Sequence, residues 1–326
     1  YVLERRSGEP FAAYLKRSVL QPLGLTSSAF EPEPALVRRL AHGEMWTLHD
    51  RSFDAPNFQL GMSPAGSMYS TMPDLARFMS VLFAGGRGPG GAVVKAATLD
   101  SMWRPQYAPR GARGGAGLGF QVGALDGRRM VSHGGAIYGF ATQLAALPDE
   151  KLGVAVSAAK DGMNALTDRI ADEALRLMLA ARAGRPLPAL DTTALPSRAL
   201  AASLAGTYVR GNVTVDVVAR DSTIVLRSTA LDHQQGLRRW RGDTLLSDDG
   251  MSYGTRVWRR GGALVVDGVS YVRRAPERRL PPAPPAAWRG LVGEYGWDHN
   301  VLYILVAAIL ITVLLPFGVY QLAEAL

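Results

Sequence analysis

Residues 119–158 read GFQVGALDGRRMVSHGGAIYGFATQLAALPDEKLGVAVSA, and this stretch decides the fold of the N-terminal part of the chain. Its apolar runs are separated by turn-forming residues at Asp126-Gly127 and at Pro148-Asp149-Glu150. Successive strands joined by such short turns pair side by side in opposite directions. The stretch therefore predicts an antiparallel sheet, with strands over 119–125, 128–133, 140–147 and 151–158.

Helices are predicted on both sides of this sheet in the sequence. One covers 7–20, a second begins at Thr71, where Thr71 and Asp74 can cap each other's backbone donors, and a third covers about 164–182. Helices before and after an antiparallel sheet are typical of the α+β class. The apolar positions expected to face inward in the third helix are Leu166, Ile170, Leu175 and Leu179.

A Pro-rich linker at 186–202 separates residues 1–185 from a β-rich region at 203–280. Alternating valines and frequent turns predict a small closed, or nearly closed, barrel there. The motif Leu-Ala-Gly-Thr-Tyr at 204–208 recurs as Leu-Val-Gly-Glu-Tyr at 291–295. A second β-module is therefore expected from residue 288 to the end of the sequence at 326.

The tail offers two interpretations. Residues 301–320 carry no charge, and a helix of that length would cross the ~30 Å hydrocarbon core of a bilayer. Alternatively, Val301–Val306 is a strand of the second module and the remainder is an apolar helix docked on protein. The sequence pattern leaves both open.

Composition excludes several function classes. The 326 residues contain no cysteine, so disulfides, thiolate metal sites and cysteine nucleophiles are excluded. The net charge of +8 comes almost entirely from arginine and is spread evenly along the chain, so we expect no nucleic-acid partner. The sequence implies no metal and no cofactor.

Two serine motifs suggest nucleophiles, but their contexts argue against both. Gly250-Met-Ser252-Tyr-Gly254, followed by Asp267 and His299, matches a nucleophile elbow, yet residues 255–259 continue as a strand instead of a helix. Ser157-Ala-Ala-Lys160 ends an apolar strand, whereas a serine–lysine pair needs a helical turn to share a face. We interpret both as turn residues.

The third candidate is His133-Gly134-Gly135-Ala136, a titratable imidazole at a strand end beside two backbone positions without side chains. Around it the chain resembles the penicillin-recognising serine hydrolases, which include class C β-lactamases, D-alanyl-D-alanine carboxypeptidases and related esterases. The resemblance covers Tyr1 to about Arg185. Its other carriers are the LQPLGLTS run at 20–27, the PAGSMYSTMPDLARF run at 64–78 and the GLGF run at 117–120.

The resemblance implies a β-lactamase/transpeptidase-like fold and a role for each residue of this motif. His133, on the edge strand of the sheet, would supply positive potential or a proton near the substrate. Gly134 and Gly135 would let the substrate lie close to the strand, and the Ala136 backbone N–H would be one of two oxyanion-hole donors. The family's S-x-x-K helix and Tyr-x-Asn element match nothing here, so the sequence predicts a fragment without its nucleophile, inactive by itself.

The predicted function is therefore that of a serine hydrolase acting on an ester or amide bond, lactam or peptide, through an acyl-serine intermediate. Its partner would be a small-molecule or peptide substrate. The alternative is a noncatalytic, membrane-attached binding protein whose barrel holds a ligand. The resemblance and the apolar tail lead us to expect an extracytoplasmic or membrane-associated protein.

Overall fold

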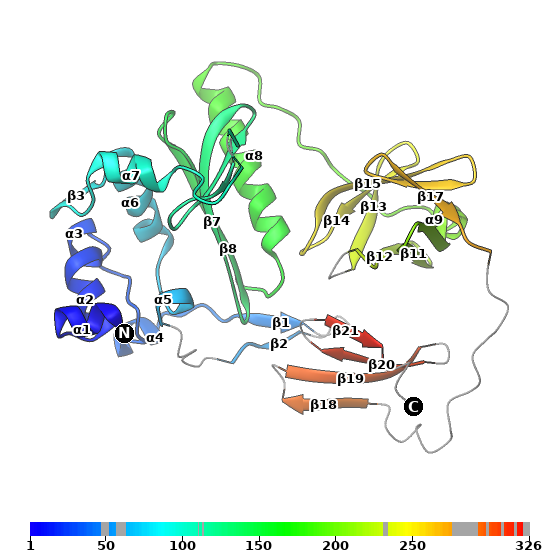
Figure 1. Ribbon diagram of the computed structural model, residues 1–326, viewed down its shortest axis with the longest axis horizontal. Helices are drawn as coiled ribbons and strands as arrows, with labels where there is room; N and C mark the ends of the chain where they lie inside the picture. Colours follow the sequence, from blue (N-terminus) through cyan, green and yellow to red (C-terminus); the bar gives the residue numbers. More distant parts are fainter. Residues whose placement is uncertain are drawn as a thin grey trace. The chain divides into compact units, whose positions relative to one another are not determined.

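A computed structural model describes residues 1–46, 52–56, 63–109, 111–112, 114–230, 234–275, 293–297, 300–307, 310–315 and 318–321 (Figure 1). These residues divide into two compact units. The first comprises Tyr1–Met45 and Asp54–Leu190, and the second comprises Trp46–Phe53 and Asp191–Leu326.

The first unit contains helices and an antiparallel sheet, which confirms the α+β prediction. Its helical segments are α1 (Val2–Ser7), α2 (Phe11–Leu15), the π-helical turn η1 (Lys16–Leu20), α3 (Gln21–Leu23), α4 (Pro34–Val37), α5 (Ser63–Gly66), α6 (Met72–Phe83), α7 (Ala96–Met102) and α8 (Asn164–Arg182). Its five-stranded sheet has the order β5 (Gly115–Ala116), β6 (Gln121–Leu125), β7 (Arg128–Ile137), β8 (Phe140–Leu147) and β9 (Leu152–Ala158). Short strands β1 (Glu44–Trp46), β2 (Ser52–Asp54), β3 (Arg87–Gly88) and β4 (Gly91–Ala92) lie outside it.

The predicted start of the helix at 7–20 is wrong. Helix α1 ends at Gly8, which has a left-handed φ of 73°, and α2 begins only after Pro10. A glycine in this conformation ends a helix because the backbone turns away from the helical path. From Phe11 the chain is helical to Leu23, where Leu20 and Leu23 pack into a buried cluster with Val81 of α6.

Helices α6 and α7 pack on one face of the sheet, and α8 packs on the other. Val131 and Ala146 contact Leu82 of α6 and Leu99 of α7, whereas other sheet residues contact α8. Figure 1 shows α8 lying along β7 and β8. This arrangement fixes the sheet rigidly between two helical layers.

The predicted inward face of α8 needs correction. Leu166 and Ile170 are 40% and 46% exposed, whereas Thr167 and Ala171 are fully buried against the sheet. Small side chains let the helix axis approach the strands closely, so the buried stripe lies one position further along the helix than the large residues indicated. Only Leu175 of the predicted four is fully buried.

The second unit contains the predicted barrel, which is closed and has eight antiparallel strands, each paired with the next along the chain. They are β10 (Gly206–Arg210), β11 (Val213–Arg220), β12 (Thr223–Ser228), β13 (Gln235–Arg241), β14 (Thr244–Asp248), β15 (Tyr253–Arg260), β16 (Ala263–Val266) and β17 (Val269–Arg273). Among the described residues, the last strand closes on the first through two residue pairs, Tyr208 with Arg273 and Val209 with Val272, and through a hydrogen bond from the Arg274 N–H to the Thr207 carbonyl.

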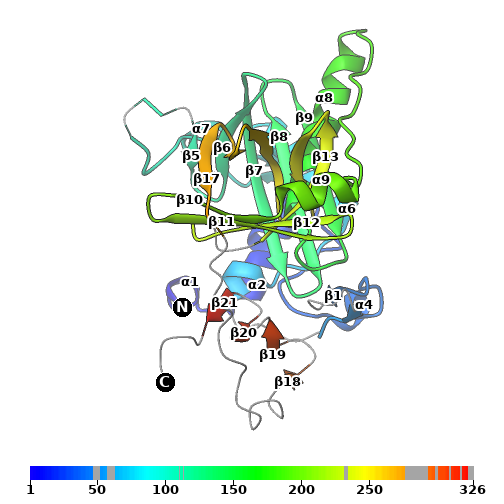
Figure 2. The same cartoon turned by 90° about the vertical axis from the view of Figure 1, so that its right-hand side faces the viewer.

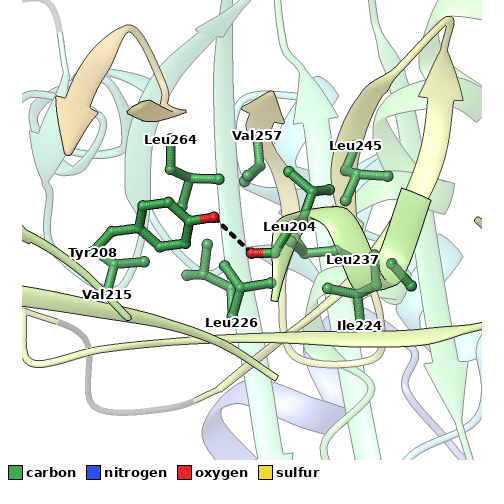
Figure 3. Close-up of a cluster of buried hydrophobic side chains, with 11 residues drawn as sticks. Leu204, Tyr208, Val215, Ile224, Leu226, Leu237, Leu245, Val257 and Leu264 are labelled. Atoms are coloured by element: carbon green, nitrogen blue, oxygen red, sulfur yellow. Dashed lines mark hydrogen bonds between the residues drawn. The ribbon is translucent and has the colours of Figure 1, made fainter. Parts of the chain in front are cut away.

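Side chains fill the interior of the barrel (Figure 3). Helix α9 (Arg198–Leu204) occupies the end of the expected linker, lies against β11 (Figure 2) and contributes Ala201 and Leu204 to this core. The hydroxyl of Tyr208, which is 1% exposed, donates to the Leu204 carbonyl at 2.8 Å. A filled interior does not favour the alternative of a ligand-holding barrel.

The internal repeat recurs in the strands. In β18 (Gly293–Trp297), β19 (Asn300–Ala307) and β20 (Leu310–Leu315), each bound lies 87 residues after the corresponding bound of β10, β11 and β12, since 293 − 206, 300 − 213 and 310 − 223 all equal 87. With β21 (Gly318–Gln321) they form a four-stranded sheet. These strands lie within the range predicted for a second β-module, 288–326.

The apolar tail therefore does not form the helix that either interpretation required. The strand interpretation of Val301–Val306 is confirmed by β19, but the described residues beyond it form β20 and β21. Valine, isoleucine and tyrosine recur in these segments and favour extended backbone. Within the described ranges, no helix is long and apolar enough to cross a membrane.

Candidate active site

The predicted site lies on the second half of β7, and its position differs from the predicted edge strand. Strand β7 is the third of five, with β8 paired along 131–137. Its pairing with β6 stops at Ser132, opposite Gln121. Beyond Ser132, the described residues place no strand on that side, so residues 133–137 have one open edge within a central strand.

The register of the hairpin decides which backbone groups face the open edge. The two turn residues Asp126 and Gly127 have positive φ values of 48° and 81°, as in a type I′ turn, so Leu125 and Arg128 form a hydrogen-bonded pair. Backbone groups alternate along a strand, so the even-numbered residues of β7 direct their N–H and C=O toward the β6 side. The N–H groups of Gly134 and Ala136 therefore point to the open edge.

His133 is exposed, as a residue acting on a bound molecule must be. Its Nδ1 lies 2.7 Å from the Gly134 carbonyl oxygen. A carbonyl oxygen only accepts, so Nδ1 carries the proton in this contact and Nε2 remains available to a substrate or another side chain. His133 projects from the same face as Val131, which is the face covered by α6 and α7.

Of Gly134 and Gly135, only Gly135 lies where the neighbouring residues leave no space for a side chain. A Cβ atom added at Gly135 would overlap the Thr142 hydroxyl of β8, whereas one added at Gly134 would meet Gln143 Oε1 at an ordinary 3.6 Å. Any larger residue at 135 would therefore require the Thr142 side chain to move. At 134 there is room for a side chain.

Sequence reasoning missed Asn164, the first residue of α8. Its Nδ2 donates to the Gly135 carbonyl at 3.0 Å. The sequence marked this asparagine only as a helix boundary, because the contact joins residues 29 positions apart. The signal available in the sequence was an asparagine at the start of a helix that follows a sheet with a glycine-rich strand end.

The structure does not support Ser252 as a nucleophile. It lies in the loop between β14 and β15, where its N–H donates to Asp249 Oδ1 at 2.7 Å. Asp267 instead accepts from the Arg256 N–H at 2.8 Å. His299, the third member of that motif, lies outside the described residues. The interpretation of this motif as a hairpin turn is confirmed.

Ser157 and Lys160 are not on one helical turn. Ser157 is in β9, and Lys160 follows the strand end, in a bridge with Glu44. The register places Ser157 opposite Thr142, which is opposite Gly135. Two strand spacings separate Ser157 from β7, about 10 Å, which is too far for a hydrogen bond with His133 or Gly135.

Three carboxyl groups on or just before α8 have raised pKa values. Burial raises the pKa of Asp161, and a hydrogen bond from the Gly162 backbone partly opposes this. Burial also raises the pKa of Asp168, helped by the charge of Asp172. Burial raises the pKa of Asp172 as well, although Arg176 lowers it. These groups favour the protonated form more in the folded chain than in the unfolded chain.

The raised pKa values predict a pH-dependent gain from Asp168→Asn combined with Asp172→Asn. A raised folded-state pKa means that stability falls as pH rises from the ordinary value of 3.8 through the raised values. We expect the double variant to have a larger free energy of unfolding than the parent at pH 7 and an equal one near pH 3. Urea unfolding across this range measures both, and a gain that persists at pH 3 would contradict the explanation.

In the part of the chain that the structure describes, no group of three or more His, Asp or Glu side chains is placed to hold a metal ion. The arrangement around β7 instead offers backbone donors and one imidazole along an open strand edge. Such an edge can bind an extended or planar molecule and stabilise negative charge that develops on it.

The chain is similar to several known proteins. The sequence model of the family described as Beta-lactamase matches residues 1–178. A human protein described as beta-lactamase-like 1 is 29% identical over 210 residues, which cover 63% of this chain and 39% of the human protein. This chain thus spans less than two thirds of that relative.

Two solved structures illustrate the structural neighbours. The octameric penicillin-binding protein homologue from Pyrococcus abyssi is 18% identical, with a TM-score of 0.47, over 83% of this chain and 61% of that one. A class C beta-lactamase from Rhodobacter sphaeroides is 16% identical, with a TM-score of 0.40, over 49% of this chain and 52% of that one.

Proposed function

The chain belongs to the beta-lactamase family, and we propose from this that the protein hydrolyses an ester or amide bond through an acyl-serine intermediate. The observation that carries the proposal is the open edge of β7. There the N–H groups of Gly134 and Ala136 face an edge that pairs with no described strand, and the exposed side chain of His133 belongs to the same stretch of the strand. This edge would bind the substrate's carbonyl group from one side.

Each group on the edge has a chemical task in this reaction. The Ala136 N–H would donate to the oxygen that becomes negative when the carbonyl is attacked. His133, with Nε2 available, would supply positive potential or a proton beside the reacting atoms. Gly134 and Gly135 would let the substrate approach the backbone closely.

The attacking serine is proposed to come from residues other than these 326. The sequence contains one S-x-x-K, at Ser157 to Lys160, and these residues do not share a helical turn. Ser252 is equally unsuited, since its loop holds it 6% exposed, with no hydrogen-bond partner for its Oγ among the described residues. By itself the 326-residue chain would contribute the strand side of the site and no turnover.

The test uses a fluorophosphonate probe on the 326-residue chain and on the protein encoded by the complete reading frame that contains it. We expect the complete protein to be labelled on a serine followed three residues later by lysine, and the 326-residue chain to stay unlabelled. Labelling of Ser157 or Ser252 would refute the proposal that the nucleophile lies outside these 326 residues. No labelling of the complete protein would refute the acyl-serine proposal. Mass spectrometry of the labelled peptide identifies the residue.

His133 provides the matching prediction in the complete protein. Removing a positioned acid–base group lowers rates by about 10²- to 10⁴-fold, so His133→Gln should lower kcat/KM by at least about 100-fold. His133→Lys should retain most of the activity, because it restores a cation and a proton donor at the same strand position. Equal activity of parent and His133→Gln would exclude the role assigned to the imidazole.

A further inference from the structure

The hydrogen bond between Asn164 and β7 acts on one particular peptide group. The Gly135 carbonyl and the Ala136 N–H belong to the same planar peptide unit, and in a trans peptide they point in opposite directions. The carbonyl faces β8 and α8, where Asn164 Nδ2 donates to it at 3.0 Å. The N–H faces the open edge of β7.

A hydrogen bond to the carbonyl oxygen of a peptide unit makes the N–H of the same unit a stronger donor. A carbonyl oxygen has two lone pairs, so Gly135 can accept from Asn164 as well as from Thr142, its partner in the sheet. Drawing electron density onto the carbonyl makes the N–H of the same unit a better donor, since hydrogen bonds in a chain polarise one another. The peptide is also held against rotation.

Asn164 is well anchored for this task. Its own carbonyl accepts from Thr167 Oγ1 at 2.9 Å, and Thr167 is fully buried. Further along α8, Ala171 and Leu175 are fully buried in a cluster with Ala145 and Leu147 of β8. The first turn of α8 is therefore fixed to the sheet that carries the site.

We propose that Asn164 is a positioning residue that orients and polarises the Gly135–Ala136 peptide for binding a developing oxyanion. The proposal rests on the proposed function, because the oxyanion exists only if the protein attacks a carbonyl group. Asn164 itself touches no substrate in this role. It acts through the peptide bond to which it donates.

The hydrogen bond is tested on the 326-residue chain without any activity. In Asn164→Leu, which has similar size and no donor, the ¹³C resonance of the Gly135 carbonyl should move upfield, as carbons do when their oxygen loses a hydrogen bond. Gln143→Leu is the matched control, since it removes an amide from β8 opposite Gly134 instead of Gly135. An unchanged Gly135 resonance in Asn164→Leu would refute the positioning role whatever the enzyme does.

The kinetic consequence is tested on the complete protein. We expect Asn164→Leu to lower kcat about tenfold with KM within about twofold, because the oxyanion forms only in the transition state. Asn164→Asp should be as impaired at pH 7, where a carboxylate cannot donate, and should recover relative to Asn164→Leu as pH approaches the carboxyl pKa of about 4. Gln143→Leu should match the parent.

The two proposals fail in different ways. If the parent protein is active and His133→Gln is impaired but Asn164→Leu keeps its kcat, the positioning role is wrong and the acyl-serine function stands. If the parent forms no acyl-serine, both fail together. A fall in thermal stability accompanied by a rise in KM, with kcat unchanged, would show that Asn164 only supports the fold.

Discussion

Removing the N–H of Ala136 in the complete protein is expected to lower kcat/KM for acylation by about 100- to 1000-fold, the usual effect of losing one oxyanion-hole donor. Ala136→Pro removes this group. Because the N–H faces the open edge of β7 and pairs with no described strand, proline there breaks no hydrogen bond of the sheet. The preceding residue, Gly135, tolerates the restriction that proline imposes.

Two controls separate the donor from the bulk of the proline ring. Ala136→Ser keeps the N–H and should retain kcat/KM within about threefold. Replacing residue 136 by the corresponding α-hydroxy acid turns the amide into an ester, which removes the donor with almost no change in shape, and should reproduce the loss. If the ester variant were fully active, Ala136 would not be an oxyanion donor.

The largest expected effect on stability follows from Asp74→Ala. The Asp74 side chain is 0% exposed, and its carboxylate accepts from the Ser27 N–H and the Ser28 hydroxyl, each at 2.8 Å, and from Arg77 at 2.7 Å. Removing one partner of a buried charged network costs about 3–5 kcal/mol, because the remaining groups lose their acceptor inside the protein. We expect the first unit to be destabilised by that amount.

Arg77→Ala is the matched control. Its side chain is 53% exposed, so the ion pair with Asp74 is screened by water and its loss should cost less than about 1 kcal/mol. Chemical denaturation followed through Trp103, which is buried in the first unit, measures both variants separately from the second unit once the other five tryptophans are replaced by phenylalanine. Similar losses in the two variants would mean that the ion pair, instead of the bonds to Ser27 and Ser28, stabilises this region.

Local patterns were sufficient for the hairpins of the sheet and for the third helix of the first unit. Short turns and alternating runs predicted the hairpins of β6 to β9, and the third helix has the bounds expected from its sequence. Thr71 does cap α6, accepting from the Asp74 N–H at 3.3 Å. These features depend on residues only a few positions apart, which is why a single sequence predicts them.

Features that depend on distant residues were missed. Asp74 was expected to cap α6 in return, but its carboxylate reaches Ser28, which is 46 residues earlier. Predicting the open edge within a central strand would have required knowing that β6 starts only at Gln121. Predicting the role of Asn164 would have required knowing how α8 packs on the sheet. Hydropathy could not distinguish an apolar helix from paired apolar strands in 301–320, because both bury the same side chains.

The shortest seam of the barrel has a mechanical consequence. Among the described residues, every other neighbouring pair of its strands is joined through at least three residue pairs, whereas β10 and β17 share two, followed by a hydrogen bond from the Arg274 N–H to the Thr207 carbonyl. Arg273 reinforces this line, since it donates to the Ala205 carbonyl and lies 5.9 Å from the ring of Tyr208. On heating or under mechanical force, we expect the barrel to open first between β10 and β17, where Arg273 provides side-chain contacts across the seam.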